Sequence, residues 1–406
     1  MAEENFNQIT KIFAEEIRDS RENLTIKVSV FSAGKEGSFS VPSGASTGIH
    51  EAHVVKNSEA TENVNKIISK ALIGKDIKNQ KEIDDILINL DGTKSKEKLG
   101  GNAIIGASVA VAKTAAKVKR QEVYEYLRTL SEIKPSRKAP YLYMNLINGG
   151  KHAKNGLAFQ EYHIVPMVDD AGEAVEIGIK IQNFIKEIIL AKYGKESLVL
   201  GDEGGYAPKI TNIREPLLIL NEAIEKNNLK GKVRLALDVA ASSFYKDGFY
   251  KIENKNVSKE ELMNIYGALI KEFNLLSIED PFQEEDFESF KKLKEKNKGL
   301  LVVGDDLTVT NLDRLAEAIK KNSINTMIIK PNQIGTLSET LATMKLAREN
   351  GVELIVSHRS AETMDDFIAD LAYAFGCFGL KSGAPQKEER KVKYDRLKTL
   401  CQADHK

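Results

Sequence analysis

The chain has 406 residues, of which 42% are hydrophobic and 29% charged, a length and composition that predict a folded protein of two domains. Its 59 Lys and Arg residues balance 59 Asp and Glu residues, so no global field favours a nucleic-acid partner. No apolar run approaches the ~20 residues of a membrane span, and the first residues lack the pattern of a secretory signal. With only two cysteines, Cys377 and Cys401, a disulfide framework is excluded, and we expect a cytoplasmic protein without a membrane partner.

The first third of the chain changes its hydrophobic pattern part-way. Apolar and polar residues alternate within residues 9–41, most clearly from Leu24 to Val30, which predicts antiparallel strands. Helical spacing follows over residues 61–130, and small or apolar residues from Ala103 to Ala116 predict a buried helix. Residues 131–139 have the composition of a linker. We therefore predict a smaller α+β domain over residues 1–135 and a second domain over residues 136–406.

The second domain alternates short apolar runs with helical patterns. The runs occupy residues 198–200, 235–237, 275–278, 300–303, 327–329, 354–356 and 378–380, and each ends in polar or charged residues. Helices are expected at residues 258–273, 286–298, 312–322, 337–350 and 364–375. This alternation predicts an α/β fold: a parallel sheet closed into a TIM-like β/α barrel of about 250 residues.

Three carboxylates follow barrel strands. In such a barrel the catalytic groups gather at the carboxyl ends of the strands, where Asp238, Glu279 and Asp305 are expected. Three buried anions close together are costly without a cation, and oxygen ligands favour Mg²⁺, with Mn²⁺ as a substitute. The alternative is an ion-pair belt at the barrel rim, with Lys330 and Arg359 among the partners.

Two further strand ends supply a candidate base and acid. Lys330 lies beside the carboxylates, and the metal, Arg359 and Lys381 are expected to lower its pKa so that it can remove a proton. Glu203, expected at another strand end before two glycines, could protonate a leaving hydroxyl; a turn cap is the alternative. Together these residues predict proton abstraction beside a carboxylate, followed by dehydration.

A series of longer motifs carries a family resemblance. They are SGASTG at residues 43–48, LGGNAIIG at 99–106, NGG at 148–150 with His152, QE at 160–161, GDEGG at 201–205, SIED at 277–280, GDDL at 304–307, IKPNQIG at 329–335 and SHRS at 357–360. In this order, over residues 9–397, the sequence resembles the enolase family. For that superfamily, general mechanistic knowledge already includes a lysine or histidine base acting with magnesium.

The resemblance implies reversible dehydration of 2-phosphoglycerate to phosphoenolpyruvate in glycolysis and gluconeogenesis, with two Mg²⁺ ions per active site. By matching positions, Lys330 is the base and Glu203 the acid. Asp238, Glu279 and Asp305 would bind the first ion, and Ser46 would complete the second. The implied substrate-binding residues are His152, Gln160, Glu161, Asp305, His358, Arg359, Ser360 and Lys381. Among these, Arg359 and Ser360 resemble phosphate ligands and Lys381 a partner of the substrate carboxylate. The other histidines, His163 among them, are expected to have surface or core roles.

Several departures from the family pattern bear on partners. The resemblance implies a homo-oligomer, a dimer or an octamer built from dimers, but Lys27 and Thr399 stand at positions that commonly pair across the dimer. Ala361 and Lys387 also depart from the pattern, so a relative acting on another carboxylate is one alternative. Another is a non-catalytic binding protein. The terminal Lys406 suggests plasminogen binding by a secondary cell-surface or secreted pool.

Overall fold

The structure is a computed structural model that describes residues 7–44, 48–153 and 155–403. The predicted strands of the small domain are β1 (Ile9–Arg18), β2 (Leu24–Ser32) and β3 (Lys35–Ser40), an antiparallel meander. Its helices are α1 (Asn57–Asn63), which continues through a π-helical turn (Val64–Ile68) into α2 (Ser69–Leu72), α3 (Gln80–Asp91), α4 (Gly101–Val118) and α5 (Val123–Arg128). The alternation in β2 buries Ile26, Val28 and Val30 on one face.

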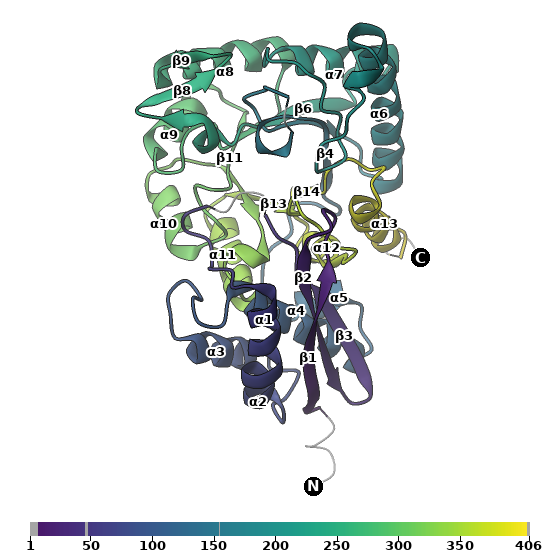
Figure 1. Cartoon of the computed structure of the whole chain (residues 1–406), viewed down its shortest axis with the longest axis vertical. Helices are drawn as coiled ribbons and strands as arrows, with labels where there is room; N and C mark the ends of the chain where they lie inside the picture. Colours follow the sequence, from purple (N-terminus) through teal and green to yellow (C-terminus); the bar gives the residue numbers. More distant parts are fainter. Residues whose placement is uncertain (1–6, 45–47, 154, 404–406) are drawn as a thin grey trace.

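The predicted buried helix is α4, which packs on β2 and β3. Gly106 allows a close approach of the helix to β2, because a Cβ atom at this position would lie 2.5 Å from Cγ2 of Val28. The helix and the sheet thus form one core. The small domain lies at one end of the barrel, beside barrel helices of the last third of the chain (Figure 1).

The second domain is a closed barrel, as predicted. Its strands, in the order of the closed sheet, are β10 (Ser277–Glu279), β11 (Leu301–Gly304), β12 (Thr326–Ile329), β13 (Glu353–Ser357), β14 (Gly379–Lys381), β4 (Tyr141–Asn148), β5 (Glu161–Pro166) and β6 (Val233–Asp238). Side chains from successive strands, including Tyr143, Val303, Ile328 and Ile355, form a separate apolar cluster that fills the barrel interior.

Helices alternate with the strands and surround the barrel (Figure 1). They are α6 (Ala171–Tyr193), α7 (Glu215–Lys226), α8 (Lys259–Phe273), α9 (Phe287–Lys296), α10 (Leu312–Lys320), α11 (Leu337–Glu349), α12 (Phe367–Ala374) and α13 (Glu388–Ala403). The five predicted helices are confirmed as α8 to α12. Capping side chains define the starts of α8 to α11: for example, Ser258 forms a capping box with Glu261 at α8, and Thr336 accepts from the backbone N–H of Glu339 at α11.

The long interval between β6 and β10 holds more than one helix. It also contains the small sheet β7 (Tyr245–Lys246), β8 (Phe249–Ile252) and β9 (Lys255–Val257), whose strands are all antiparallel. Across the parts of the chain with described positions, no helix is both long and apolar enough to cross a membrane.

Two details of the predicted barrel are wrong. The expected strand at residues 198–200 does not form: Val199 and Leu200 are 56% and 53% exposed, and Leu200 makes only an isolated bridge with Tyr206. An apolar run of three residues is too short to distinguish a strand from a loop. The sheet is also not all parallel, since β5 runs antiparallel to β4 and β6. The described part of the β4–β5 connection has no α-helix to act as a crossover, so the chain reverses direction.

The predicted division between residues 135 and 136 falls in the connection between α5, which ends at Arg128, and β4, which begins at Tyr141. Its placement within that connection stays a prediction. Ser46 and Lys406, which carry two of the predictions above, lie outside the described residues.

Candidate active site

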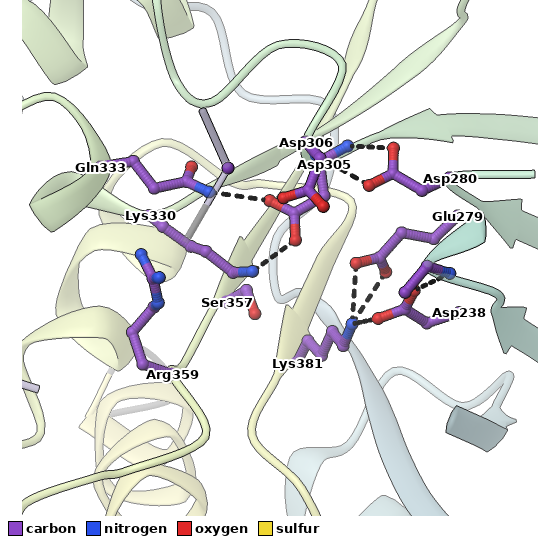
Figure 2. A network of polar contacts seen from close by, with 12 residues as sticks. Asp238, Glu279, Asp280, Asp305, Asp306, Lys330, Gln333, Ser357, Arg359 and Lys381 are labelled. Atoms are coloured by element: carbon purple, nitrogen blue, oxygen red, sulfur yellow. Dashed lines mark hydrogen bonds and ion pairs between the residues drawn. The ribbon is translucent and has the colours of Figure 1, made fainter. Parts of the chain in front are cut away.

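The carboxylates at the barrel mouth lie on neighbouring strands. Asp238 and Glu279 are the last residues of β6 and β10 and stand opposite each other in the parallel register. Asp305 follows β11, Lys330 follows β12 and Lys381 ends β14. Because these strands are parallel, their carboxyl ends meet, and the five side chains converge as Figure 2 shows.

Lys381 is the central cation of this group. Its Nζ lies 2.9 Å from Oδ2 of Asp238, 2.8 Å from Oε1 of Glu279 and 3.4 Å from Oε2 of Glu161. Burial lowers the pKa of Lys381, but the surrounding carboxylates outweigh it and raise the pKa well above its ordinary value. Lys381 is therefore charged at neutral pH.

Lys330 also pairs with a carboxylate. Its Nζ donates to Oδ2 of Asp305, whose Oδ1 accepts from Nε2 of Gln333 at 3.0 Å (Figure 2). The expected lowering of the Lys330 pKa is wrong for this state: burial lowers it, but Asp305 outweighs burial, and the pKa is raised. Lys330 and Lys381 are therefore both in ion pairs with carboxylates, as the alternative of an ion-pair belt at the barrel rim describes.

The mouth holds more negative than positive charge. Burial and neighbouring carboxylates raise the pKa of Glu279 and Asp280 well above the ordinary range, and that of Asp306 to about 7. Asp280 accepts from the backbone N–H groups of Asp305 and Asp306 at 3.0 and 2.7 Å. Burial is the largest cause of these raised pKa values, and the repulsion between neighbouring carboxylates adds to it. A hard divalent cation would supply positive charge here, and the oxygen donors fit it.

Two compact groups of metal-type ligand atoms occur within the described chain, each with its atoms within 4.8 Å of one another. They are His152, Glu161 and Glu203, and Asp280, Asp305 and Asp306. Only Asp305 of the predicted trio belongs to one of them, whereas Asp238 and Glu279 bind Lys381. The predicted roles of Asp238, Glu279 and Asp305 as ligands stay predictions.

Glu203 lies on a loop between α6 and α7, not on a barrel strand. Glycines let this loop approach β4 closely, because they have no Cβ atom. A Cβ atom at Gly205 would lie 2.5 Å from Oδ1 of Asn148, and one at Gly201 would also be too close to Asn148. The turn is closed by a 2.8 Å hydrogen bond from the N–H of Gly201 to the carbonyl of Gly205. Glu203 is thereby buried, and its Oε2 accepts from Nδ2 of Asn145 at 3.0 Å.

Glu203 and Glu161 form a coupled pair around His152. Nδ1 of His152 lies 3.5 Å from Oε1 of Glu161 and 3.6 Å from Oε1 of Glu203. Burial and the charge of Glu203 raise the pKa of Glu161 well above its ordinary value. Burial alone would raise the pKa of Glu203, but His358 and His152 lower it by more. The pKa of Glu203 therefore lies well below its ordinary value. Two buried carboxylates this close cannot both ionise freely, so the pair retains a proton.

On the opposite side of the cavity, Arg359 contacts the small domain. Its Nη1 and Nη2 lie 2.9 and 3.2 Å from Oε2 and Oε1 of Glu51, and Nη1 also donates to Oδ1 of Asn332 at 3.2 Å. The small domain thus reaches the site through Glu51, a residue that the sequence did not single out. Ser360 follows Arg359 and is buried beside it.

One cavity of about 30 Å³ brings nearly all the predicted residues together. Its lining includes His152, Gln160, Glu161, Glu203, Asp238, Asp305, Lys330, His358, Arg359, Ser360 and Lys381. Glu279 lies behind Lys381 and does not line it. Ser46 is outside the described residues, but Gly44 lines the cavity from the small domain.

Sequence reasoning missed several polar partners. His163 was expected in a surface or core role, but its Nε2 lies 2.9 Å from Oε2 of Glu161, and burial and Lys381 lower its pKa to about 3. The signal was available, since residues two apart on a strand share a face. Gln333 lies inside the IKPNQIG motif at residues 329–335, whereas Glu51 and Arg390 lie outside all of the motifs that carry the family resemblance. Arg390 is fully buried and contacts the loops of both Glu203 and His358.

Comparison with known proteins covers nearly the whole chain. A family model described as "Enolase, N-terminal domain" matches residues 9–127, and one described as "Enolase, C-terminal TIM barrel domain" matches residues 137–402. The chain belongs to the enolase family. An enolase of Methanocaldococcus jannaschii is 46% identical over 402 residues, 96% of this chain and 94% of that protein. Enolases of Methanosarcina barkeri and Methanococcus aeolicus are 44% and 42% identical and are covered over 93% and 95% of their lengths.

The family gives this protein its enzyme class. It is a lyase of the phosphopyruvate hydratase type, with a function in glycolysis. Enolase membership also implies a divalent metal ion, a small-molecule substrate and oligomerisation, and the acidic groups at the barrel mouth could bind such an ion.

Proposed function

We propose that the barrel mouth of this enolase converts 2-phosphoglycerate to phosphoenolpyruvate and water, and catalyses the reverse reaction, with Lys330 as base and Glu203 as acid. The observation that supports these roles is that a buried amine and a buried carboxyl line one narrow cavity from different sides. Both groups are shielded from solvent, which strengthens their electrostatic interactions with a bound substrate.

Lys330 removes the proton from the carbon next to the substrate carboxylate. Asp305 favours the charged form of the lysine, while Arg359 and Lys381 favour the neutral form. A cation held by Asp305 would offset the effect of this carboxylate and would favour the neutral amine, the form that accepts a proton.

Glu203 supplies the second proton of the reaction. The electron pair left by the abstracted proton forms the carbon–carbon double bond, the bond to the hydroxyl breaks, and Glu203 protonates the hydroxyl to give water. Glu161 lies close enough to keep a proton within the pair. His152 lies between the two carboxyls and fits a role in transferring that proton.

The remaining residues hold the substrate and the ions. Arg359 and Ser360 are assigned to the phosphate, Lys381 to the carboxylate, and His152, Gln160, Glu161, Asp305 and His358 to the walls of the pocket. Two Mg²⁺ ions are proposed, with Mn²⁺ as a substitute: Asp238, Glu279 and Asp305 would hold the first, and Ser46 would complete the second. When bound, the ions would stabilise the negative charge of the enediolate.

A phosphoenolpyruvate absorbance assay tests the reaction, the base and the metal together. Wild type should form product from 2-phosphoglycerate with Mg²⁺ and lose activity with EDTA. Lys330→Ala should lose about 10³-fold or more in kcat, because a positioned general base contributes an effect of this order. Lys321→Ala, on the outer surface of α10, is the matched control and should retain activity. Absence of product from wild type under conditions where another enolase is active would contradict the proposal.

The assembly and location of the enzyme are separate proposals. We propose a homo-oligomer in the cytoplasm, a dimer or an octamer of dimers. Lys27 lies 3.8 Å from Glu15 of its own sheet, and Thr399 donates to the carbonyl of Asp395, so both are engaged within the chain. Light scattering of the purified protein, and of Lys27→Glu, tests the assembly. Plasminogen binding stays a prediction, tested by removing Lys406.

A further inference from the structure

One buried guanidinium joins the two loops that carry the proposed acid and the phosphate ligands. Arg390 on α13 is fully buried. Its Nη1 donates to the carbonyl of Arg359 at 2.7 Å and its Nη2 to the carbonyl of Ser360 at 2.6 Å. Nη2 also lies 3.3 Å from the carbonyl of Asp202, next to Glu203. Arg390 therefore contacts the backbone just after His358 and the backbone just before Glu203.

A further contact of Arg390 determines the chemistry of the His358 ring. Nη1 of Arg390 lies 2.6 Å from Nδ1 of His358. A guanidinium has hydrogen-bond donors and no acceptor, so Nδ1 must accept and cannot carry a proton. A neutral imidazole then carries its proton on Nε2. That nitrogen lies 3.2 Å from Oε1 of Glu203.

We propose that Arg390 is a positioning residue that holds His358 as the neutral Nε2–H tautomer and directs this N–H toward the Glu203 carboxylate. The inference rests on the proposed role of Glu203 as acid. The protonated ring is disfavoured in this arrangement because a second N–H would point at the donor groups of Arg390. Arg390 thus acts on Glu203 through His358, without touching the carboxylate.

The surroundings of His358 favour the neutral ring. Burial lowers its pKa to about 4, and Arg390 acts in the same direction, against the carboxylates Glu203 and Glu362. The charged and titratable groups that face the ring are Glu203, Arg390, Glu362 and, from β5, His163. A close fit keeps the ring in place: a Cβ atom at Gly383 would lie 3.2 Å from both Cε1 of His358 and Cδ of Arg390.

The tautomer has a consequence for catalysis. A neutral His358 places no positive charge beside Glu203 and leaves the proton of the acid with the Glu203–Glu161 pair. Without Arg390 the ring could protonate beside Glu203. The cation would stabilise the Glu203 carboxylate, lower its pKa and reduce the fraction that is protonated at neutral pH. Product formation would then require a lower pH.

Nitrogen NMR of the histidine side chains tests the tautomer directly. Wild type labelled with ¹⁵N-histidine should show His358 with a proton on Nε2 alone across neutral pH, assigned by comparison with His358→Gln. In Arg390→Met the signal should change to a mixture with the Nδ1–H form or to the imidazolium. kcat for phosphoenolpyruvate formation should fall at least about tenfold, more than KM changes, and the basic limb of the pH profile should move to lower pH. Arg390→Lys, which keeps a donor, should restore part of the wild-type profile.

Arg396→Met is the matched control. Arg396 lies on the same helix but bonds Asp370 and Glu122, away from both loops, so its loss should leave the His358 signal and the pH profile unchanged. A wild-type His358 with its proton on Nδ1, or a wild-type signal and pH profile in Arg390→Met, would overturn the inference. If Arg390→Met does not fold, the wild-type spectrum still decides. Full activity of Glu203→Gln would instead refute the acid assignment while leaving the tautomer intact.

Discussion

Glu51 binds the guanidinium that is proposed to hold the substrate phosphate, so the phosphate would compete with Glu51 for N–H donors of Arg359. The two side chains are only 4% and 6% exposed, and two N–O contacts of 2.9 and 3.2 Å join them. In Glu51→Gln one acceptor oxygen becomes an amide NH₂ that cannot accept from Arg359. The loss of one hydrogen bond between charged groups is worth about 2 kcal/mol, or roughly 30-fold in a binding constant.

Inhibition of phosphoenolpyruvate formation by inorganic phosphate measures this competition. In Glu51→Gln the inhibition constant and the KM for 2-phosphoglycerate should both fall, by up to about 30-fold, at constant ionic strength. The unliganded variant should lose about 2 kcal/mol of unfolding free energy, since the same contact stabilises the free protein. Glu285→Gln is the control: Glu285 also joins the domains, through His50, but does not bind Arg359. An inhibition constant that stayed the same or rose in Glu51→Gln would refute the displacement of Glu51.

Three further changes test other parts of the structure. The pKa of His163 is about 3, below its ordinary value of 6.5, so its neutral form contributes stability that is present above pH 6.5 and lost as the pH falls toward 3. The difference in unfolding free energy between wild type and His163→Gln, from urea titrations, should therefore shrink on acidification; a difference independent of pH would contradict this. Asp84 accepts from the backbone N–H and Oγ of Ser338 at 2.9 and 2.6 Å. Asp84→Asn should cost about 2–4 kcal/mol in denaturant unfolding, whereas a change under about 0.5 kcal/mol would show that the contact contributes little. Asp280 orients the backbone of Asp305, so Asp280→Asn should weaken Mg²⁺ binding roughly 10- to 100-fold by calorimetry, and an unchanged affinity would rule out that role.

The barrel could be predicted where local signals were strong. Buried strands followed by a charged residue and then by an amphipathic helix repeat from β6 onward, and the structure has β10 to β14 at those places. The start of the barrel lacks this repeat. β4 is almost wholly buried, and the described part of its connection to the antiparallel β5 holds no α-helix, so neither periodicity nor spacing distinguishes the pair. The apolar run at residues 198–200, by contrast, lies on the surface.

The side-chain partners in the site could not be predicted from local patterns. Arg359 and Glu51 are separated by 308 positions, and Arg390 reaches His358 from the last helix. The pKa of Lys330 was expected to fall because the sequence brings cations to the mouth, but the contact with Asp305 decides its direction. Residue types at strand ends thus indicate which groups meet, whereas their pKa values depend on contacts of a few ångströms that only the folded chain specifies.

The small domain holds the segment that follows the proposed base. Ala52 donates its backbone N–H to the carbonyl of Gln333 at 2.8 Å, Lys96 binds Glu339 at 2.8 Å, and Asp84 binds the first turn of α11 at Ser338. These contacts reach the middle of the connection between β12 and α11 and the first turn of α11. Lys330 begins that connection, so a displacement of the small domain would release the loop beside the base as well as Glu51 beside Arg359. The position of the base and the occupancy of the phosphate site are therefore coupled to the same interface between the domains, and substrate binding that displaces Glu51 acts on a surface that also supports Lys330.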